Sequence, residues 1–181
     1  MGQDRTHMWV QSFIYDTPFG PGKRWLSSGW TGRLLGGWQL NGAFSVYSGT
    51  PMTFSYSATA LNAPGNSQRA NIKSEPAVLG NIGPGQKWFD TSVFSIPAAA
   101  TFGNAGRNTF SGPGYWNLDM SVVKKFLMTE RFRAEIRLEV FNVTNTPHFN
   151  NPSSALDSTA FGTITSAFGE RQVQLAAKVH F

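Results

Sequence analysis

Residues 115–143 read YWNLDMSVVKKFLMTERFRAEIRLEVFNV, and this stretch decides the fold. It holds two runs in which apolar and polar residues alternate, separated by a short break at residues 127–130. Alternation with a period of two is typical of β-strands that have one apolar and one polar face. The short break predicts that the two strands form an antiparallel hairpin.

The polar face of the second run is a row of four charges of alternating sign, Arg133, Glu135, Arg137 and Glu139. Each run is roughly 10–12 residues long, about twice the usual strand of a soluble domain and about what a tilted strand needs to cross a bilayer. A water-filled barrel lumen would solvate such a row, and so would the open face of a soluble sheet. The apolar faces hold Trp116, Leu118, Met120 and Val122 in the first run and Phe132, Ala134, Ile136, Leu138 and Val140 in the second.

The composition suits β-structure with long loops. Charged residues make up 14% of the 181 residues and aromatic residues another 14%, with 19 glycines and 10 prolines. No apolar run approaches the roughly 18 residues of a transmembrane helix, but a transmembrane β-barrel needs only alternate apolar residues. The basic residues behind the net charge of +5 are scattered, so we expect no nucleic-acid partner.

No pattern for catalysis, a metal or a cofactor emerges. Glu135 and Glu139 lie four residues apart on one strand, roughly 13 Å at the usual rise, which is too far for a glycosidase pair. A cross-strand charge ladder is the better interpretation of these carboxylates. The three histidines lack ligand spacing and there is no cysteine. We therefore expect no enzyme activity, no metal site and no cofactor.

Three further strands are expected at residues 7–17, 38–47 and 171–181. The alternation of the second continues through Met52, Phe54 and Tyr56, which predicts a continuation of that strand with a bulge at residues 49–51. The third runs to the terminal aromatic residue of the sequence. Its alternating apolar positions are Val173, Leu175, Ala177, Val179 and Phe181.

Two long segments, about residues 57–114 and 144–170, show no sustained alternation and are expected to be surface loops. Loops of this length are usually functional or disordered, and by their position these two are the expected ligand-facing surface. Long outer loops with short periplasmic turns are typical of outer-membrane barrels. The connection at residues 18–37 does not fit, because it lies on the turn side yet is too long for a tight turn.

The predicted fold is all-β, with about five long antiparallel strands. A free-standing bacterial barrel has at least about eight strands and no open edges, so five strands cannot close. We therefore expect residues 1–181 to be the C-terminal sector of a larger outer-membrane barrel domain. Outer-membrane lipid would contact its apolar face, and upstream strands would complete the barrel.

Short motifs along nearly the whole chain support this interpretation. They include FIYDTPFG (13–20), GWQLNG (37–42), SGTP (48–51), WFDT (88–91), FGNAGRN (102–108), GPGY (112–115), NLD (117–119), ERFR (130–133), EVFN (139–142), FGTI (161–164) and RQVQL (171–175). In these motifs the chain resembles the C-terminal barrel portion of TonB-dependent receptors, specifically the Oar-like group with a carboxypeptidase-regulatory-like N-terminal domain.

The resemblance implies a barrel of about 22 strands, plugged by an N-terminal domain. It implies transport driven by TonB, which would act only through the N-terminal part that residues 1–181 lack, together with the plug and the upstream strands. It also implies that the terminal strand ending at Phe181 is the signal read by the barrel-assembly machinery, and that the row from Arg133 to Glu139 faces the lumen. The location implied is the outer membrane.

One alternative stays open at this point, a soluble or secreted β-sandwich that binds carbohydrate. In a sandwich, exposed tryptophans such as Trp9, Trp38 and Trp116 would be platforms for sugars. In a barrel, the same tryptophans near strand ends would form the aromatic girdle at the membrane interface.

Overall fold

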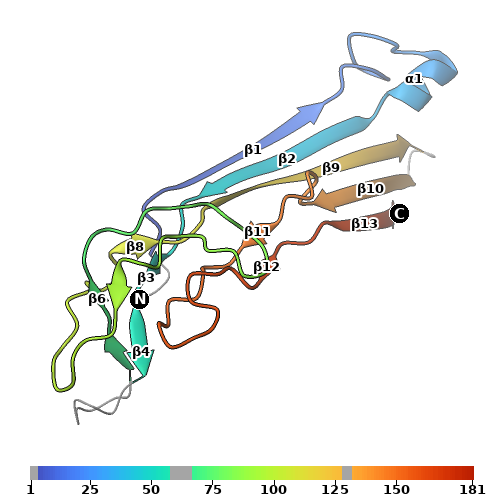
Figure 1. The fold of residues 1–181 in the computed structure, drawn as a ribbon. Helices are drawn as coiled ribbons and strands as arrows, with labels where there is room; N and C mark the ends of the chain where they lie inside the picture. Colours follow the sequence, from blue (N-terminus) through green and yellow to red (C-terminus); the bar gives the residue numbers. More distant parts are fainter. Residues whose placement is uncertain (1–3, 58–66, 128–131) are drawn as a thin grey trace. The chain divides into compact units, whose positions relative to one another are not determined.

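The computed structural model describes residues 4–57, 67–127 and 132–181 (Figure 1). The chain divides into two compact units. The sheet unit comprises Trp9–Val46, Trp116–Thr146 and Gly169–Phe181, and the loop unit comprises Met1–Met8, Tyr47–Tyr115 and Pro147–Phe168. Among the residues described, no helix is long and apolar enough to span a membrane.

Five long strands form one sheet in the order β1-β2-β9-β10-β13. They are β1 (Met8–Asp16), β2 (Trp38–Tyr47), β9 (Tyr115–Leu127), β10 (Arg133–Phe141) and β13 (Gln172–His180). β10 pairs antiparallel with β9 on one side and with β13 on the other. The all-β prediction and the pairing of the two runs in residues 115–143 are confirmed. Most of the predicted turn, residues 128–131, lies outside the described residues.

The register fixes which side chains share a face. Ile136 lies opposite Lys124 of β9 and Ala177 of β13, whereas Glu135 lies opposite Lys125 and Lys178. Since side chains alternate along each strand, the even-numbered positions of β9 and β10 share one face with the odd-numbered positions of β13. We call this the apolar face and the other the polar face.

The connection between β1 and β2 contains the short helix α1 (Gly29–Leu35). This element was not expected, because seven residues are too few for a helical period to stand out in the sequence. The backbone N–H of Gly36 closes the helix by donating to the carbonyl of Gly32, at 2.9 Å. A Cβ at Gly20 would lie 2.6 Å from the Cα of Gly36, so the chain segment before the helix packs directly on its end only because both residues are glycine.

The loop unit is built from pairs of very short strands. Antiparallel pairs join β3 (Pro51–Met52) with β8 (Phe110–Ser111), β4 (Ser55–Ser57) with β5 (Ser67–Arg69), β6 (Asn71–Ile72) with β7 (Phe94–Ser95), and β11 (His148–Phe149) with β12 (Ala167–Phe168). Residues 67–114 and 147–168 thus contain strands of their own, which the lack of long alternation had concealed.

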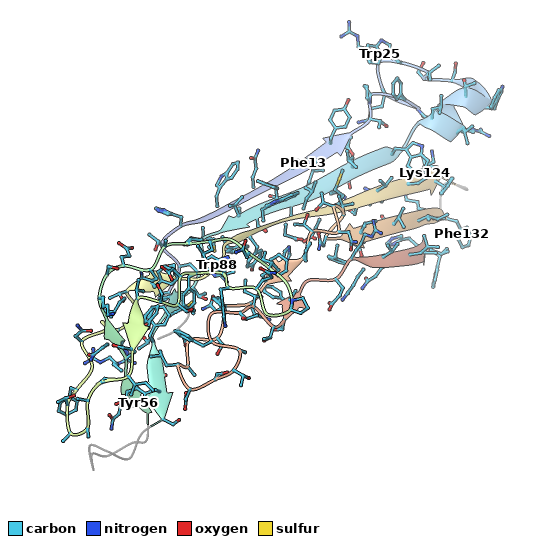
Figure 2. All side chains as sticks on the ribbon, in the orientation of Figure 1. Phe13, Trp25, Tyr56, Trp88, Lys124 and Phe132 are labelled. Carbon is cyan, nitrogen blue, oxygen red and sulfur yellow. The ribbon has the colours of Figure 1, made fainter. Side chains whose placement is uncertain are left out.

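These short strands enclose an aromatic core. The rings of Phe54 and Phe89 are fully buried, with centroids 5.3 Å apart, and Phe110 packs against both. Trp88, labelled in Figure 2, contacts Phe110 at 5.8 Å between centroids. The rest of the core comprises Met52, Ala70, Ala105 and Ile164.

The predicted continuation of β2 past residue 49 is wrong, because β2 ends at Tyr47 and the chain enters separate short strands. Met52, Phe54 and Tyr56 do point inward, as their alternation predicted, but they belong to β3 and to the segment through β4, which pair with β8 and β5. Pro51 has no N–H to donate to a ladder. At Gly49 a Cβ would lie 1.7 Å from the carbonyl oxygen of Gly112, so the chain approaches another backbone there and leaves the path of β2.

Candidate functional site in the sheet and the loop unit

The four charges predicted as a row lie together on the polar face of β10. Arg133, Glu135, Arg137 and Glu139 alternate with apolar residues along the strand, as the sequence indicated. The guanidinium of Arg137 pairs with Glu135 at 2.9 Å and with Glu139 at 3.5 Å. Both partners of Arg137 lie on β10 itself. Arg137 therefore does not form the expected ion pairs across neighbouring strands.

Lysines from both neighbouring strands extend this charged surface. Lys125 of β9 and Lys178 of β13 lie directly opposite Glu135 in the register. The polar face therefore carries both signs of charge across three adjacent strands. The Arg137 side chain retains 44% of its exposure, so water solvates this surface.

The apolar face is also exposed, although it consists of hydrophobic side chains. Ile136 and Leu138 of β10 lie beside Ala177 and Leu175 of β13, and Leu175 is 76% exposed. Exposed contiguous apolar patches of this kind mark surfaces that contact a partner or a membrane. Val173, Leu175, Ala177 and Val179 all lie on this face, and Phe181 follows at 95% exposure.

Aromatic rings lie toward both ends of the apolar face. At one end Phe44 joins Trp9 of β1 and Trp116 of β9, at 5.7 and 6.0 Å between centroids. At the other end lie Trp38, the first residue of β2, and Phe126 of β9. Aromatic girdles on both sides of an apolar band are typical of transmembrane barrels.

Lys124 is a cation on the apolar face, and the sequence analysis missed it. Its ammonium group donates to the carbonyl oxygens of Arg33 (3.0 Å), Leu34 (2.9 Å) and Gly36, at the C-terminal end of α1. It also lies over the rings of Trp38 and Phe126, at 5.1 and 5.2 Å from their centroids. The alternation that begins at Trp116 puts every even-numbered residue of this run on the apolar face. Continued to residue 124, it would have shown a lysine on that face.

Asn142 was also missed, although it organises the exit from β10. Its amide donates to the carbonyls of Thr146 (2.8 Å) and Gly169, and its side-chain oxygen accepts from the N–H of Thr146 at 3.0 Å. The backbone φ of 48° lies in the left-handed region, which asparagine tolerates better than most residues. An asparagine directly after the last apolar residue of a strand is the signal that could have found it.

The loop unit has a hollow of about 590 Å³. Its lining includes the hydroxyl-bearing residues Thr159, Thr163, Thr165 and Ser166, and the apolar residues Ile82 and Phe149. No charged side chain is among the residues that line it. This chemistry suits a neutral polar ligand, and the hollow draws on both segments predicted as ligand-facing loops.

Two carboxylates of the loop unit are held by backbone N–H groups. Hydrogen bonding from Ser92, at 2.9 Å, lowers the pKa of Asp90, and hydrogen bonding from Ser57, at 3.2 Å, lowers the pKa of Asp157. Asp90 forms a turn with Ser92 two residues later, whereas Asp157 joins two segments that lie far apart in the sequence. Within the described ranges, no group of three or more His, Cys, Asp or Glu side chains could hold a metal ion.

The comparisons with known proteins agree with this geometry. A family model described as an outer membrane beta barrel domain matches residues 1–174. No curated protein and no solved structure matches the chain. The matched span includes most of the five-stranded sheet, whose apolar face and aromatic girdles suit a bilayer. A barrel family over this span rules out the alternative fold, a β-sandwich. The chain belongs to the outer membrane beta barrel domain family and is located in the outer membrane.

Proposed function

We propose that this chain supplies the barrel wall, surface loops and terminal assembly strand of a TonB-dependent receptor of the Oar-like group. The observation that carries the proposal is a single antiparallel sheet with a charged, solvated polar face and an exposed apolar face. The motifs shared with that group support the finer assignment. The chain has no chemistry of its own in this function and acts as a wall and a surface.

The polar face would line the lumen. Arg133, Glu135, Arg137 and Glu139 then contact lumen water or the plug domain of the receptor. A lumen filled with water solvates these charges, whereas lipid on that side would leave them unsolvated at a cost of about 2–4 kcal/mol for a mid-membrane Arg or Lys.

Further strands would complete the barrel on both sides of this sheet. β1 and β13 stand at its two edges in the order observed. Each edge presents backbone N–H and C=O groups that need a partner in a membrane, because no water is available there. A receptor barrel of about 22 strands supplies those partners.

The terminal strand would carry the assembly signal. Val173, Leu175, Ala177 and Val179 place an apolar stripe on one face of the edge strand β13, and Phe181 extends it. We expect Phe181→Ala to lower the amount of assembled protein in the outer membrane, with Phe141→Ala as the control for loss of a phenylalanine elsewhere on the sheet. Equal assembly of both variants would contradict this role.

The decisive experiment separates the receptor role from the barrel itself. The complete native protein is purified from outer membranes, and its heat-modifiable gel mobility is recorded. The periplasmic domain of TonB is then tested for binding to it. We expect heat-modifiable mobility together with TonB binding. A heat-modifiable protein that does not bind TonB would leave the barrel established and overturn the receptor role.

A further inference from the structure

We propose that the connection between β1 and β2 is a membrane anchor that lies in the head-group region of an anionic phospholipid leaflet. This inference rests on the outer-membrane location of the sheet and not on the proposed role with TonB. The anchor comprises residues 17–37, with α1 in its C-terminal half.

The first support is the position at which the ammonium group of Lys124 binds the C-terminal end of α1. Lys124, Trp38 and Phe126 lie on the apolar face, and Lys124 binds the last carbonyls of α1. The indole N–H of Trp38 also donates to the carbonyl of Leu34 at 3.0 Å. The end of α1 is therefore tied to the lipid side of the sheet. Figure 2 shows Lys124 at the end of the sheet that bears this connection.

The second support is the surface that this connection presents. Trp30 is 74% exposed and Leu34 58% exposed, although both are large apolar residues. Trp25 and Leu35 are also half exposed. Tryptophan and leucine on a short amphipathic element suit insertion at the boundary between head groups and acyl chains.

The third support is charge. Lys23, Arg24 and Arg33 are the charged residues of the segment, which has no Asp or Glu. Arg24 lies over the Trp25 ring at 5.6 Å from its centroid, so cation and aromatic ring are presented together. The three cations of the segment, with no acidic residue among them, complement phospholipid phosphate groups.

The leaflet follows from the connection lengths. β9 and β10 are joined at this end by the short stretch of residues 128–132, whereas the long segments of the loop unit leave from the other end of the strands. Short turns mark the periplasmic side of outer-membrane barrels. The anchor therefore meets the periplasmic leaflet. At that depth the ammonium group of Lys124 donates its hydrogen bonds to carbonyls of α1 and not to lipid.

The test uses the lack of cysteine in these residues. In the complete protein, reconstituted in vesicles, Trp30→Cys is labelled with a fluorophore, and quenching by nitroxide-bearing lipids is measured. Leu175→Cys on the apolar face reports insertion of the sheet, and Phe102→Cys, 79% exposed in the loop unit, is the control for an apolar site in water. We expect quenching at positions 30 and 175 and none at position 102.

The charge arm compares phosphatidylcholine vesicles with vesicles that also contain phosphatidylglycerol. We expect quenching at position 30 to be stronger with phosphatidylglycerol, and the variant Lys23→Gln/Arg24→Gln/Arg33→Gln to lose this preference. A label at 175 that is quenched while the label at 30 is not would overturn the anchor. An unquenched label at 175 would overturn it as well, since the apolar face would then not contact lipid. Equal quenching in both vesicle types would overturn the anionic preference.

Discussion

The sheet unit and the loop unit use the same kinds of apolar side chain for opposite purposes. In the loop unit Phe54 and Phe89 are fully buried among other aromatic rings. In the sheet unit Leu175 and Val173, both on the apolar face, are 76% and 62% exposed. The first set is removed from water by protein and the second by lipid, so an identical substitution should have very different consequences in the two units.

The largest expected effect is in the aromatic core. Phe89→Ala removes a ring that contacts Phe54 and Phe110, and should cost the loop unit about 3–5 kcal/mol. Phe102→Ala removes an exposed ring of the same unit and should cost no more than about 0.5 kcal/mol. Hydrogen exchange of the loop amides in the reconstituted protein measures the loss. Equal protection in the two variants, or loss of the heat-modifiable barrel in Phe89→Ala, would break the comparison.

The next largest loss of stability is expected in the sheet unit, at the hydrogen bonds made by the Asn142 side chain. Asn142→Ala leaves the N–H of Thr146 and the carbonyl of Gly169 without their partner and puts alanine at a positive φ. We expect a loss of about 2–3 kcal/mol in urea unfolding of the reconstituted barrel. Asn142→Gly removes the cost of the positive φ but restores no hydrogen bond. It should therefore be about 1 kcal/mol more stable than Asn142→Ala. If glycine were no better than alanine, the left-handed conformation would not be part of the cost.

Close packing on the apolar face gives a smaller effect. A Cβ at Gly42 would lie 2.3 Å from the ring of Phe13, so the ring crosses the place where a side chain would be. Gly42→Ala should cost about 1–2 kcal/mol, because the Phe13 ring is 40% exposed and can move. The double variant Gly42→Ala/Phe13→Ala should recover most of the loss in the same urea titration. Additive losses would mean that the ring does not restrict position 42.

The ion pairs of β10 should contribute less again. Arg137 pairs with Glu135 and Glu139 while remaining 44% exposed, and exposed pairs contribute about 0.2–1 kcal/mol. Arg137→Gln should therefore lower the free energy of unfolding by less than about 1 kcal/mol. A double-mutant cycle with Glu135→Gln isolates the pair. A coupling above about 2 kcal/mol would show that this face is dry, against a water-filled lumen.

The sequence predicted the sheet unit well because lipid and water impose a period of two on every long strand. The alternation in β9, β10 and β13 identified the strands, their faces and the charged row. It did not identify Lys124, because this exception to the pattern donates to carbonyls of α1 that lie 91 and 90 positions earlier in the chain. Contacts that distant leave no local trace in the sequence.

The loop unit was not predicted, for the complementary reason. Its strands β3 and β6 to β8 have two residues each, too short for alternation to be recognised. Its core joins Phe54, Phe89 and Phe110 across more than fifty positions of Gly-, Asn- and Pro-rich chain. The apolar residues were visible in the sequence, but the pairing that brings them together depends on turns and close glycine contacts such as that of Gly103 with the carbonyl of Arg69.

The smallest expected effect is a pH dependence confined to the loop unit. Hydrogen bonding from Ser57 lowers the pKa of Asp157 below its ordinary value of 3.8. A carboxyl with a depressed pKa stabilises the folded state above its unfolded pKa, and this contribution disappears as the pH falls through the folded value. Asp157→Asn should therefore slightly reduce protection of the loop amides at neutral pH and flatten its decline below about pH 4. Arg137→Gln leaves this carboxylate in place and should keep the decline. An unchanged acid decline in Asp157→Asn would show that the carboxylate does not support the loop unit, and a decline that follows Arg137 instead would assign the acid sensitivity to the sheet.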